Sequence, residues 1–154
     1  MLQKRYENTC NWILSHNDFI SWEKGDGKAV LWIDGGPGCG KSVLSAFMAK
    51  ELHLSAHGNQ RSVVYFFCDD KDDRLRTARA ILANWLAQLL WQTPDFLAHF
   101  PEESREKPGQ TVWTFGMLWR VFRRVIQNAR GPVCLLVDAL GIFSRTVCTK
   151  NGTN

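Results

Sequence analysis

The residues best suited to chemistry in this chain lie in one short glycine-rich segment, which reads Gly35-Gly36-Pro37-Gly38-Cys39-Gly40-Lys41-Ser42. A glycine, four further residues and then Gly-Lys-Ser is the spacing of a phosphate-binding loop. Glycines let the backbone take positive φ angles and approach a ligand closely, so that successive N–H groups can point into one concavity. The spacing therefore predicts a cradle for the phosphate groups of a nucleotide.

Individual side chains complete this predicted site. Lys41 would contact the β- and γ-phosphates as the catalytic cation, and the hydroxyl of Ser42 would ligate Mg²⁺. Val43 follows in the predicted helix, whose positive end adds to the cradle. Asp138 ends an apolar run that begins at Val133, and a carboxylate at a strand tip would order Mg²⁺ through water, opposite Ser42. We thus expect residues 35–43 to bind the nucleotide, with Ser42 and Asp138 on the metal.

The flanks of the loop have the patterns of a strand and a helix. The compact apolar run 30–33 predicts a buried parallel strand that enters the loop, and residues 43–52 are predicted to form a helix that leaves it. Two further strands are predicted, over 63–68 and 133–138, and two further helices, over 77–91 and 115–126. Residues 94–110 are predicted to be a loop. The alternation of strands and helices predicts an α/β fold.

The composition argues against several other classes of protein. With 154 residues, 45% hydrophobic, the chain is long and apolar enough to bury the core of one domain. Five scattered cysteines without a Cys-x-x-Cys pair argue against a disulfide framework or a zinc site, and predict a reducing compartment, the cytoplasm. No apolar stretch approaches the ~18 residues of a membrane span. The net charge of +4 suits a polyanionic small ligand and nucleic acid equally. Arg120, Arg123 and Arg124 are interpreted as a solvated helix face rather than a nucleic-acid site.

Residues 1–28 are predicted to form a helical lead-in, with Thr9 capping a short first helix. This lead-in carries the aromatic residues Trp12, Phe19 and Trp22. One interpretation is that these aromatic side chains pack the lead-in onto the domain. The alternative is that they shape a pocket for a nucleotide base beside the phosphate-binding loop.

Taken together, segments from residue 10 to residue 140 resemble the NACHT-type, nephrocystin-like NTPase domain of fungal STAND signalling proteins. The segments that carry the resemblance are Cys10-x-Trp12-Ile13-Leu14, Leu31 to Ser42, Tyr65-Phe66-Phe67-Cys68-Asp69-Asp70, Ile81-Leu82-x-x-Trp85-Leu86-x-Gln88-Leu89-Leu90 and Val137-Asp138-Ala139-Leu140. The resemblance implies a phosphate-loop NTPase with a three-layer α/β/α architecture and a parallel sheet. It also implies binding of ATP or GTP with Mg²⁺, slow hydrolysis and assembly into oligomers.

The chain departs from the family pattern after Asp138. Where the family continues Asp-Ala-Leu-Asp-Glu-Cys, this chain reads Asp138-Ala139-Leu140-Gly141-Ile142-Phe143, so the acidic pair that would position the attacking water is missing. Residues 141–154 match nothing in the family and are predicted to be disordered. In the family's sheet a later strand lies between the loop strand and the aspartate strand. About three core strands are expected here, with a gap between these two and an unpaired edge.

These observations predict three segments: a lead-in over 1–28, a partial NACHT domain over 29–140 and a tail over 141–154. The predicted function is binding of ATP or GTP by a truncated NACHT-type NTPase, with hydrolysis weak or absent. Its predicted partners are the nucleotide and NACHT domains, in a homotypic oligomer or in full-length relatives, and not nucleic acid or membranes. One alternative is a small-molecule or nucleotide kinase, for which Arg74, Arg76 and Arg79 are the candidate lid residues. A second is a non-catalytic fragment that docks onto relatives through its unpaired edge.

Overall fold

A computed structural model of the chain describes residues 9–26, 29–59, 61–68, 77–106, 109, 111–138 and 145–150. Its strands are β1 (Val30–Asp34), β2 (Ser62–Phe67), β3 (Val133–Asp138) and β4 (Arg145–Lys150). Its α-helices are α1 (Asn17–Lys24), α2 (Lys41–Asn59), α3 (Ala78–Gln92), α4 (Glu102–Glu106) and α5 (Phe115–Gln127). Two 3-10 helices, η1 (Asn11–Ser15) and η3 (Pro94–His99), complete the described elements.

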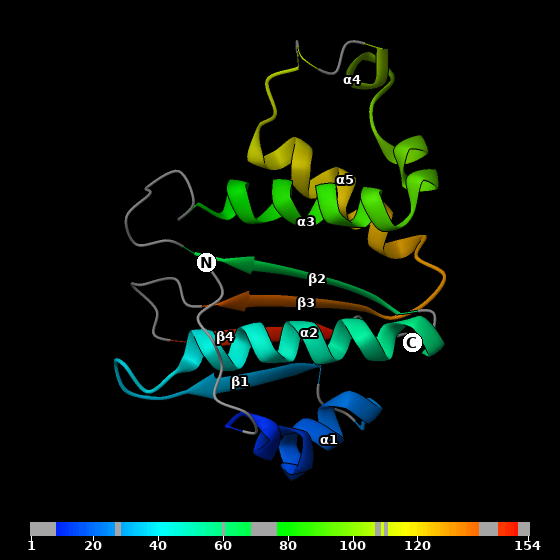
Figure 1. Cartoon of the computed structure of the whole chain (residues 1–154). Helices are drawn as coiled ribbons and strands as arrows, with labels where there is room; N and C mark the ends of the chain where they lie inside the picture. Colours follow the sequence, from blue (N-terminus) through cyan, green and yellow to red (C-terminus); the bar gives the residue numbers. More distant parts are fainter. Residues whose placement is uncertain are drawn as a thin grey trace.

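The strands form one sheet in the order β1-β4-β3-β2. Strands β2 and β3 pair in parallel, whereas β4 pairs antiparallel with both β1 and β3. Strands β1, β2 and β3 therefore run in the same direction, and their carboxyl ends lie at the edge of the sheet where α2 begins (Figure 1). This is the edge at which open α/β sheets bind their ligands.

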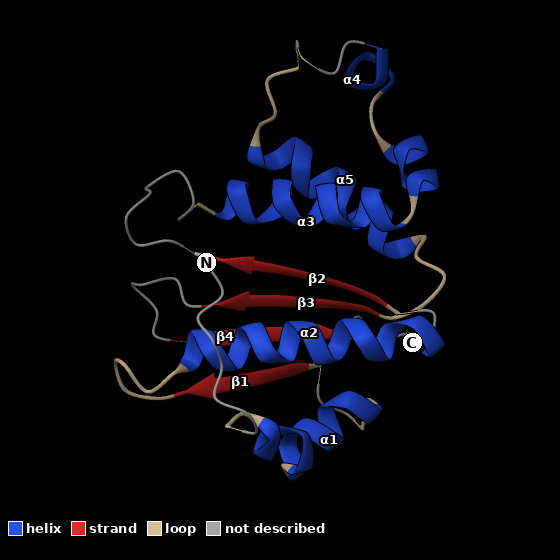
Figure 2. Ribbon diagram, viewed as in Figure 1, coloured by secondary structure: helices blue, strands red, loops and turns tan. Residues whose placement is uncertain are grey.

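Helices cover the two faces of the sheet, which gives the three layers expected for this α/β fold (Figure 2). Successive residues of a strand point to opposite faces, so Val63 belongs to the core under α1 and α2 and Val64 to the core under α3 and α5. In β3, Cys134 and Leu135 divide in the same way. The residues of α1 and α2 that are fully covered in the first core include Trp22, Met48 and Leu52.

The structure corrects the prediction for β1, which was expected to be a buried parallel strand. It is the terminal strand of the sheet, and its pairing with β4 is antiparallel. Only Leu31 is buried, whereas Val30 is 47% and Trp32 44% exposed. The physical reason is that the second core, under α3 and α5, draws its strand residues from β2 and β3 and none from β1.

The predicted gap between β1 and β3 is also wrong, because residues 145–150 occupy it as β4. These residues were predicted to belong to a disordered tail, and the structure differs there. Only residues 139–144 connect β3 to β4. A parallel neighbour would need a crossover of about a dozen residues or more. A connection as short as this one therefore fits only an antiparallel strand.

The helices were predicted more accurately than the connections. The structure confirms the helices at α3 and α5, which begin after Thr77 and Thr114; each threonine side chain accepts a hydrogen bond from the third residue after it. Thr9 does not cap η1, whose N-cap position is Cys10 and has no side-chain cap bond. The predicted loop over 94–110 contains η3 and α4. No helix among the described residues is both long and apolar enough to cross a membrane.

The outer edge of β2 is covered by glutamine side chains from α3. Gln88 accepts a hydrogen bond from the Tyr65 N–H (3.1 Å) and donates one to the Tyr65 carbonyl (2.7 Å). Gln92, one helical turn later, donates to the Val63 carbonyl (2.8 Å). A side-chain amide has the donor and acceptor of a peptide group, so Gln88 occupies the bonding positions that another strand would take.

Candidate nucleotide-binding site

The predicted phosphate-binding loop joins the carboxyl end of β1 to the start of α2. Gly38 and Gly40 have φ angles of +75° and +89°, in the left-handed region that favours glycine. The Cys39 N–H donates to the Gly36 carbonyl at 3.4 Å, and the first bond of the helix runs from Leu44 N–H to the Gly40 carbonyl at 2.9 Å. Helix geometry therefore leaves the N–H groups of residues 41–43 without intrahelical acceptors, at the positive end of α2.

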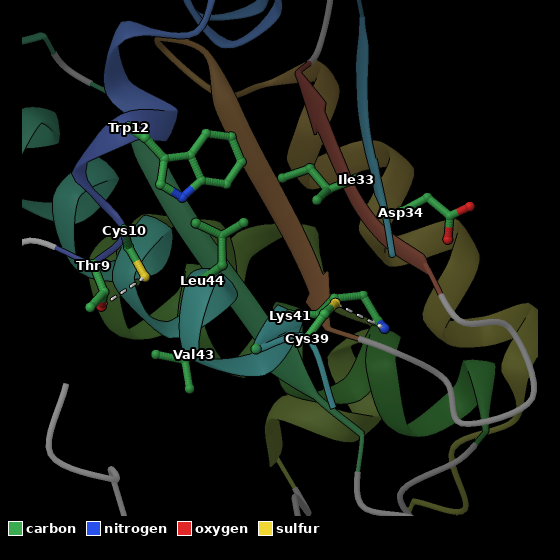
Figure 3. A pocket seen from close by; sticks show the side chains of 10 residues that line it. Thr9, Cys10, Trp12, Ile33, Asp34, Cys39, Lys41, Val43 and Leu44 are labelled. Carbon is green, nitrogen blue, oxygen red and sulfur yellow. Dashed lines mark hydrogen bonds between the residues drawn. The ribbon is translucent and has the colours of Figure 1, made fainter. Parts of the chain in front are cut away.

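The ammonium of Lys41 lies inside this loop. Its Nζ donates hydrogen bonds to the carbonyl oxygens of Gly35 at 2.7 Å and of Gly36 at 2.8 Å. The sulfur of Cys39 is 3.8 Å from the same nitrogen (Figure 3). The loop thus curls around one positive charge, which is held by neutral carbonyl groups rather than by a carboxylate in these contacts.

The glycines of the loop differ in what they would tolerate. A Cβ on Gly35 would lie 2.8 Å from the Cys39 sulfur, so this close approach depends on the absence of a side chain. Around Gly36, Gly38 and Gly40 a Cβ would meet nothing within 4 Å. The loop is therefore open on the side of these three glycines, where a ligand could approach its backbone.

Asp138 lies at the carboxyl end of β3 and is 4% exposed. Its Oδ1 accepts a hydrogen bond of 3.1 Å from the hydroxyl of Ser45, which is 1% exposed. The structure thus brings Asp138 to the first turns of α2, where it was expected to lie opposite Ser42. The bond is to Ser45, whereas Ser42 is exposed. A sequence signal that could have identified Ser45 is its spacing of three residues from Ser42, because residues three apart on a helix share a face.

A hollow of about 290 Å³ lies between the loop and the lead-in (Figure 3). Residues of both parts line it, namely Thr9, Cys10, Trp12, Ile33, Asp34, Cys39, Gly40, Lys41, Val43 and Leu44. The lead-in aromatic residues differ in their environment. Phe19 and Trp22 pack into the core, whereas Trp12 is 52% exposed and borders the hollow. Sequence reasoning had not assigned a role to Asp34.

Some residues of the family resemblance and of the kinase alternative lie outside the described residues. They are Asp69, Asp70, Arg74, Arg76 and the segment 139–144. Arg79, the remaining candidate for a kinase lid, lies in the first turn of α3 and donates to the Trp113 carbonyl at 3.4 Å. The described residues contain no cluster of three or more histidine, cysteine, aspartate or glutamate side chains that could hold a metal ion.

A profile of the family described as Nephrocystin 3, N-terminal matches residues 8–141, which include the loop, Lys41 and Asp138. The chain belongs to this nephrocystin 3 N-terminal family. It is also 31% identical to vegetative incompatibility protein HET-E-1 of Podospora anserina over 157 aligned residues, which cover 91% of this chain and 11% of that protein. No solved structure matches the chain significantly.

Membership of the nephrocystin 3 N-terminal family confirms the resemblance to a NACHT-like N-terminal domain and favours it over the kinase alternative. The sheet points in the same direction. Strand β4 lies between the loop strand β1 and the aspartate strand β3, where a later strand lies in the sheet of the NACHT family. The alternative of docking through the unpaired edge between these strands also loses its basis, since β4 pairs with both.

The side chains of this nephrocystin 3 N-terminal domain fit a magnesium nucleotide. Magnesium prefers oxygen ligands and keeps several of its waters, so one hydroxyl and one carboxylate suffice on the protein side. Ser42, in the first turn of α2, and Asp138, at the strand tip facing that helix, would supply them. The backbone amides at 41–43 and the ammonium of Lys41 would face the phosphates.

Proposed function

We propose that this chain binds the triphosphate of ATP or GTP together with Mg²⁺ and hydrolyses it weakly or not at all. The observation that carries the proposal is the position of Lys41. Its ammonium lies within hydrogen-bonding distance of two carbonyls of a loop whose glycines at 38 and 40 take positive φ, at the start of α2. This arrangement supports a role for residues 35–43 in holding phosphate groups.

The phosphate end of the site depends on backbone and charge together. Amides at the start of α2 donate to phosphate oxygens, and the helix dipole adds a partial positive charge there. Lys41 leaves the carbonyls of Gly35 and Gly36 to contact the β- and γ-phosphates. The exchange is favourable because a phosphate oxygen carries a negative charge and a peptide carbonyl does not.

The metal end of the site depends on Ser42 and Asp138. These two residues would hold Mg²⁺, which would neutralise part of the charge of the phosphates. Ser42 holds its hydroxyl at the exposed start of α2, and Asp138 holds its carboxylate at the buried end of β3. Two separate elements thus hold the metal ligands.

The base end of the site is the hollow beside the lead-in. Trp12 offers an aromatic face, and Cys10, Ile33 and Leu44 offer apolar surface. A purine is flat and apolar on both faces, so aromatic and apolar walls suit it. The volume of about 290 Å³ is near the lower end of the usual range for ligand pockets.

Weak hydrolysis follows from the residues after Asp138. The segment 139–144 reads Ala-Leu-Gly-Ile-Phe-Ser and contains no carboxylate that could orient an attacking water. Positioning of the nucleophile accounts for much of the rate of phosphoryl transfer. Without such a residue, a bound triphosphate is held rather than cleaved.

We further propose that the chain works in the cytoplasm and associates with NACHT domains, either of other copies or of longer relatives. Cys10 and Cys39 are free thiols among the described residues, which suits a reducing compartment. The matched relative is far longer, since the aligned region is 11% of its length. In such a longer relative, the parts of the chain beyond the aligned region would then receive any nucleotide-dependent signal.

The proposal is tested by titrating the full chain with ATP and with GTP in a calorimeter, with Mg²⁺ and with EDTA, and by measuring phosphate release from the same samples. We expect saturable binding that Mg²⁺ strengthens, and phosphate release close to the uncatalysed rate. A folded sample that takes up neither nucleotide contradicts the proposed binding. Rapid turnover contradicts the proposed loss of hydrolysis.

A further inference from the structure

A buried pair of polar side chains links α2 to the tip of β3. The Ser45 hydroxyl donates to Oδ1 of Asp138 at 3.1 Å, and the two residues lie 93 positions apart in the sequence. Both are among the few polar residues buried in the described part of the chain. Their neighbours on α2, Leu44, Phe47 and Met48, are buried and apolar.

The position of Ser45 is difficult to explain by helix formation or core packing. Serine is a weaker helix former than alanine or leucine, and an apolar residue would pack better at this buried position. A carboxylate removed from water, however, needs hydrogen-bond donors to offset the loss of its hydration. A hydroxyl facing an ionised carboxylate makes a charge-assisted bond, which is stronger than a neutral one.

The helix also fixes the relation of Ser45 to the proposed metal ligand. Ser45 follows Ser42 by three residues, so the two side chains share one face of α2, about 4.5 Å apart along the helix axis. Ser42 starts the helix at the loop, and Ser45 contacts Asp138 one turn deeper. Helix α2 therefore carries the hydroxyl of Ser42 and, through Ser45, also contacts the Asp138 carboxylate of β3.

We propose that Ser45 is a positioning residue for Asp138, which sets the carboxylate in the orientation that Mg²⁺ requires. This inference rests on the proposed function. The bond to Oδ1 restrains rotation of the carboxylate about its last side-chain torsion. Groups that orient metal ligands in this way contribute to metal affinity although they do not touch the metal. The magnesium-dependent part of nucleotide affinity thus depends on Ser45, and the metal-independent part does not.

The test compares ATP and GTP affinities of the full chain in Mg²⁺ and in EDTA for wild type, Ser45→Ala, Ser45→Thr and Ser55→Ala. We expect Ser45→Ala to reduce the strengthening by Mg²⁺ about tenfold, in line with other outer-shell groups, and to leave the affinity in EDTA unchanged. Ser45→Thr retains the hydroxyl and restores the effect of Mg²⁺. Ser55→Ala is the matched control, because it removes a hydroxyl on the same helix that donates to the Leu52 carbonyl, at 3.0 Å.

Several outcomes would overturn the inference. If Mg²⁺ strengthens nucleotide binding by Ser45→Ala as much as it does for wild type, the positioning role of Ser45 is contradicted, but the proposed function is not. An equal loss of affinity in Mg²⁺ and in EDTA has the same meaning. If Ser45→Ala does not fold, Ser45→Cys replaces it, since a thiol is similar in size and a much weaker donor. A wild-type chain that binds neither nucleotide contradicts the proposed function itself, which separates the two failures.

Discussion

The ammonium of Lys41 donates a hydrogen bond to the carbonyl oxygen of Gly35 at a distance of 2.7 Å. Gly35 is the first residue of the phosphate-binding motif and Lys41 is its cation, so the two ends of the loop contact each other. A second bond, to Gly36, strengthens this closure. A bound phosphate would compete with these carbonyls for the ammonium. Ligand binding would therefore replace the hydrogen bonds that close the loop.

The conformation of the loop should depend on glycine at position 40. Its φ of +89° is strained for any other residue, and we expect Gly40→Ala to lower the free energy of unfolding by about 1–2 kcal/mol. Gly36→Ala is the control for stability, because Gly36 has no positive φ and its Cβ would contact nothing within 4 Å. Urea unfolding followed by circular dichroism measures both. Equal stability of the two variants would argue against the described loop.

Strand β4 should prevent self-association of the protein, because it pairs with the edges of β1 and β3. Val147 pairs with Trp32 of β1 and with Val137 of β3, so proline there removes a backbone donor inside the sheet. We expect Val147→Pro to cost about 1–3 kcal/mol of stability and to promote self-association, because the edges of β1 and β3 become available. Val147→Thr, which keeps β-branching, is the control. Sedimentation velocity would reveal a monomeric Val147→Pro variant if the placement of β4 is wrong.

The glutamines of α3 should protect the outer edge of β2. Replacing Gln88 with leucine removes both hydrogen bonds to Tyr65, and we expect a loss of about 1–3 kcal/mol together with greater self-association. Gln127→Leu introduces the same apolar side chain at an exposed position of α5 and should have neither effect. Light scattering over a concentration series distinguishes the two. If both variants scatter light equally, the self-association comes from an exposed leucine in general, and the protective role of Gln88 is contradicted.

The lead-in should contribute to recognition of the base. We expect Trp12→Ala to weaken ATP binding about tenfold, because stacking of a base on an aromatic ring contributes about 1–3 kcal/mol. Trp91→Ala removes the same side chain from α3, where it is 89% exposed and outside the hollow, and should leave binding unchanged. Fluorescence anisotropy of a labelled nucleotide reports both. Unchanged binding in Trp12→Ala would place the base elsewhere.

Much of the site could be predicted from sequence because its determinants are local. The spacing from Gly35 to Ser42 and the strand ending at Asp138 are short patterns, and the structure places each where the pattern implied. The caps at Thr77 and Thr114 follow from local chemistry as well. The contact between Ser45 and Asp138 spans 93 residues, and no short pattern contains it.

The errors concern relations between distant segments. Residues 145–150 contain Thr146, Val147 and Thr149, which are β-branched and favour strands, but their alternation with polar residues is too short to stand out. The place of β4 depends on the space between β1 and β3, a tertiary property. The exposure of Trp32 has the same origin, because it depends on which strands α3 and α5 cover.

The most direct test of the account is a calorimetric titration of ATP and GTP, in the presence of Mg²⁺, into the wild-type chain and the variants Lys41→Ala and Lys50→Ala. Lys50 is an exposed lysine on the same helix and controls for the loss of one positive charge. We expect Lys41→Ala to bind nucleotide at least about a hundredfold more weakly, whereas Lys50→Ala binds as wild type does. Equal affinities for the wild-type chain and for a folded Lys41→Ala variant would contradict this expectation.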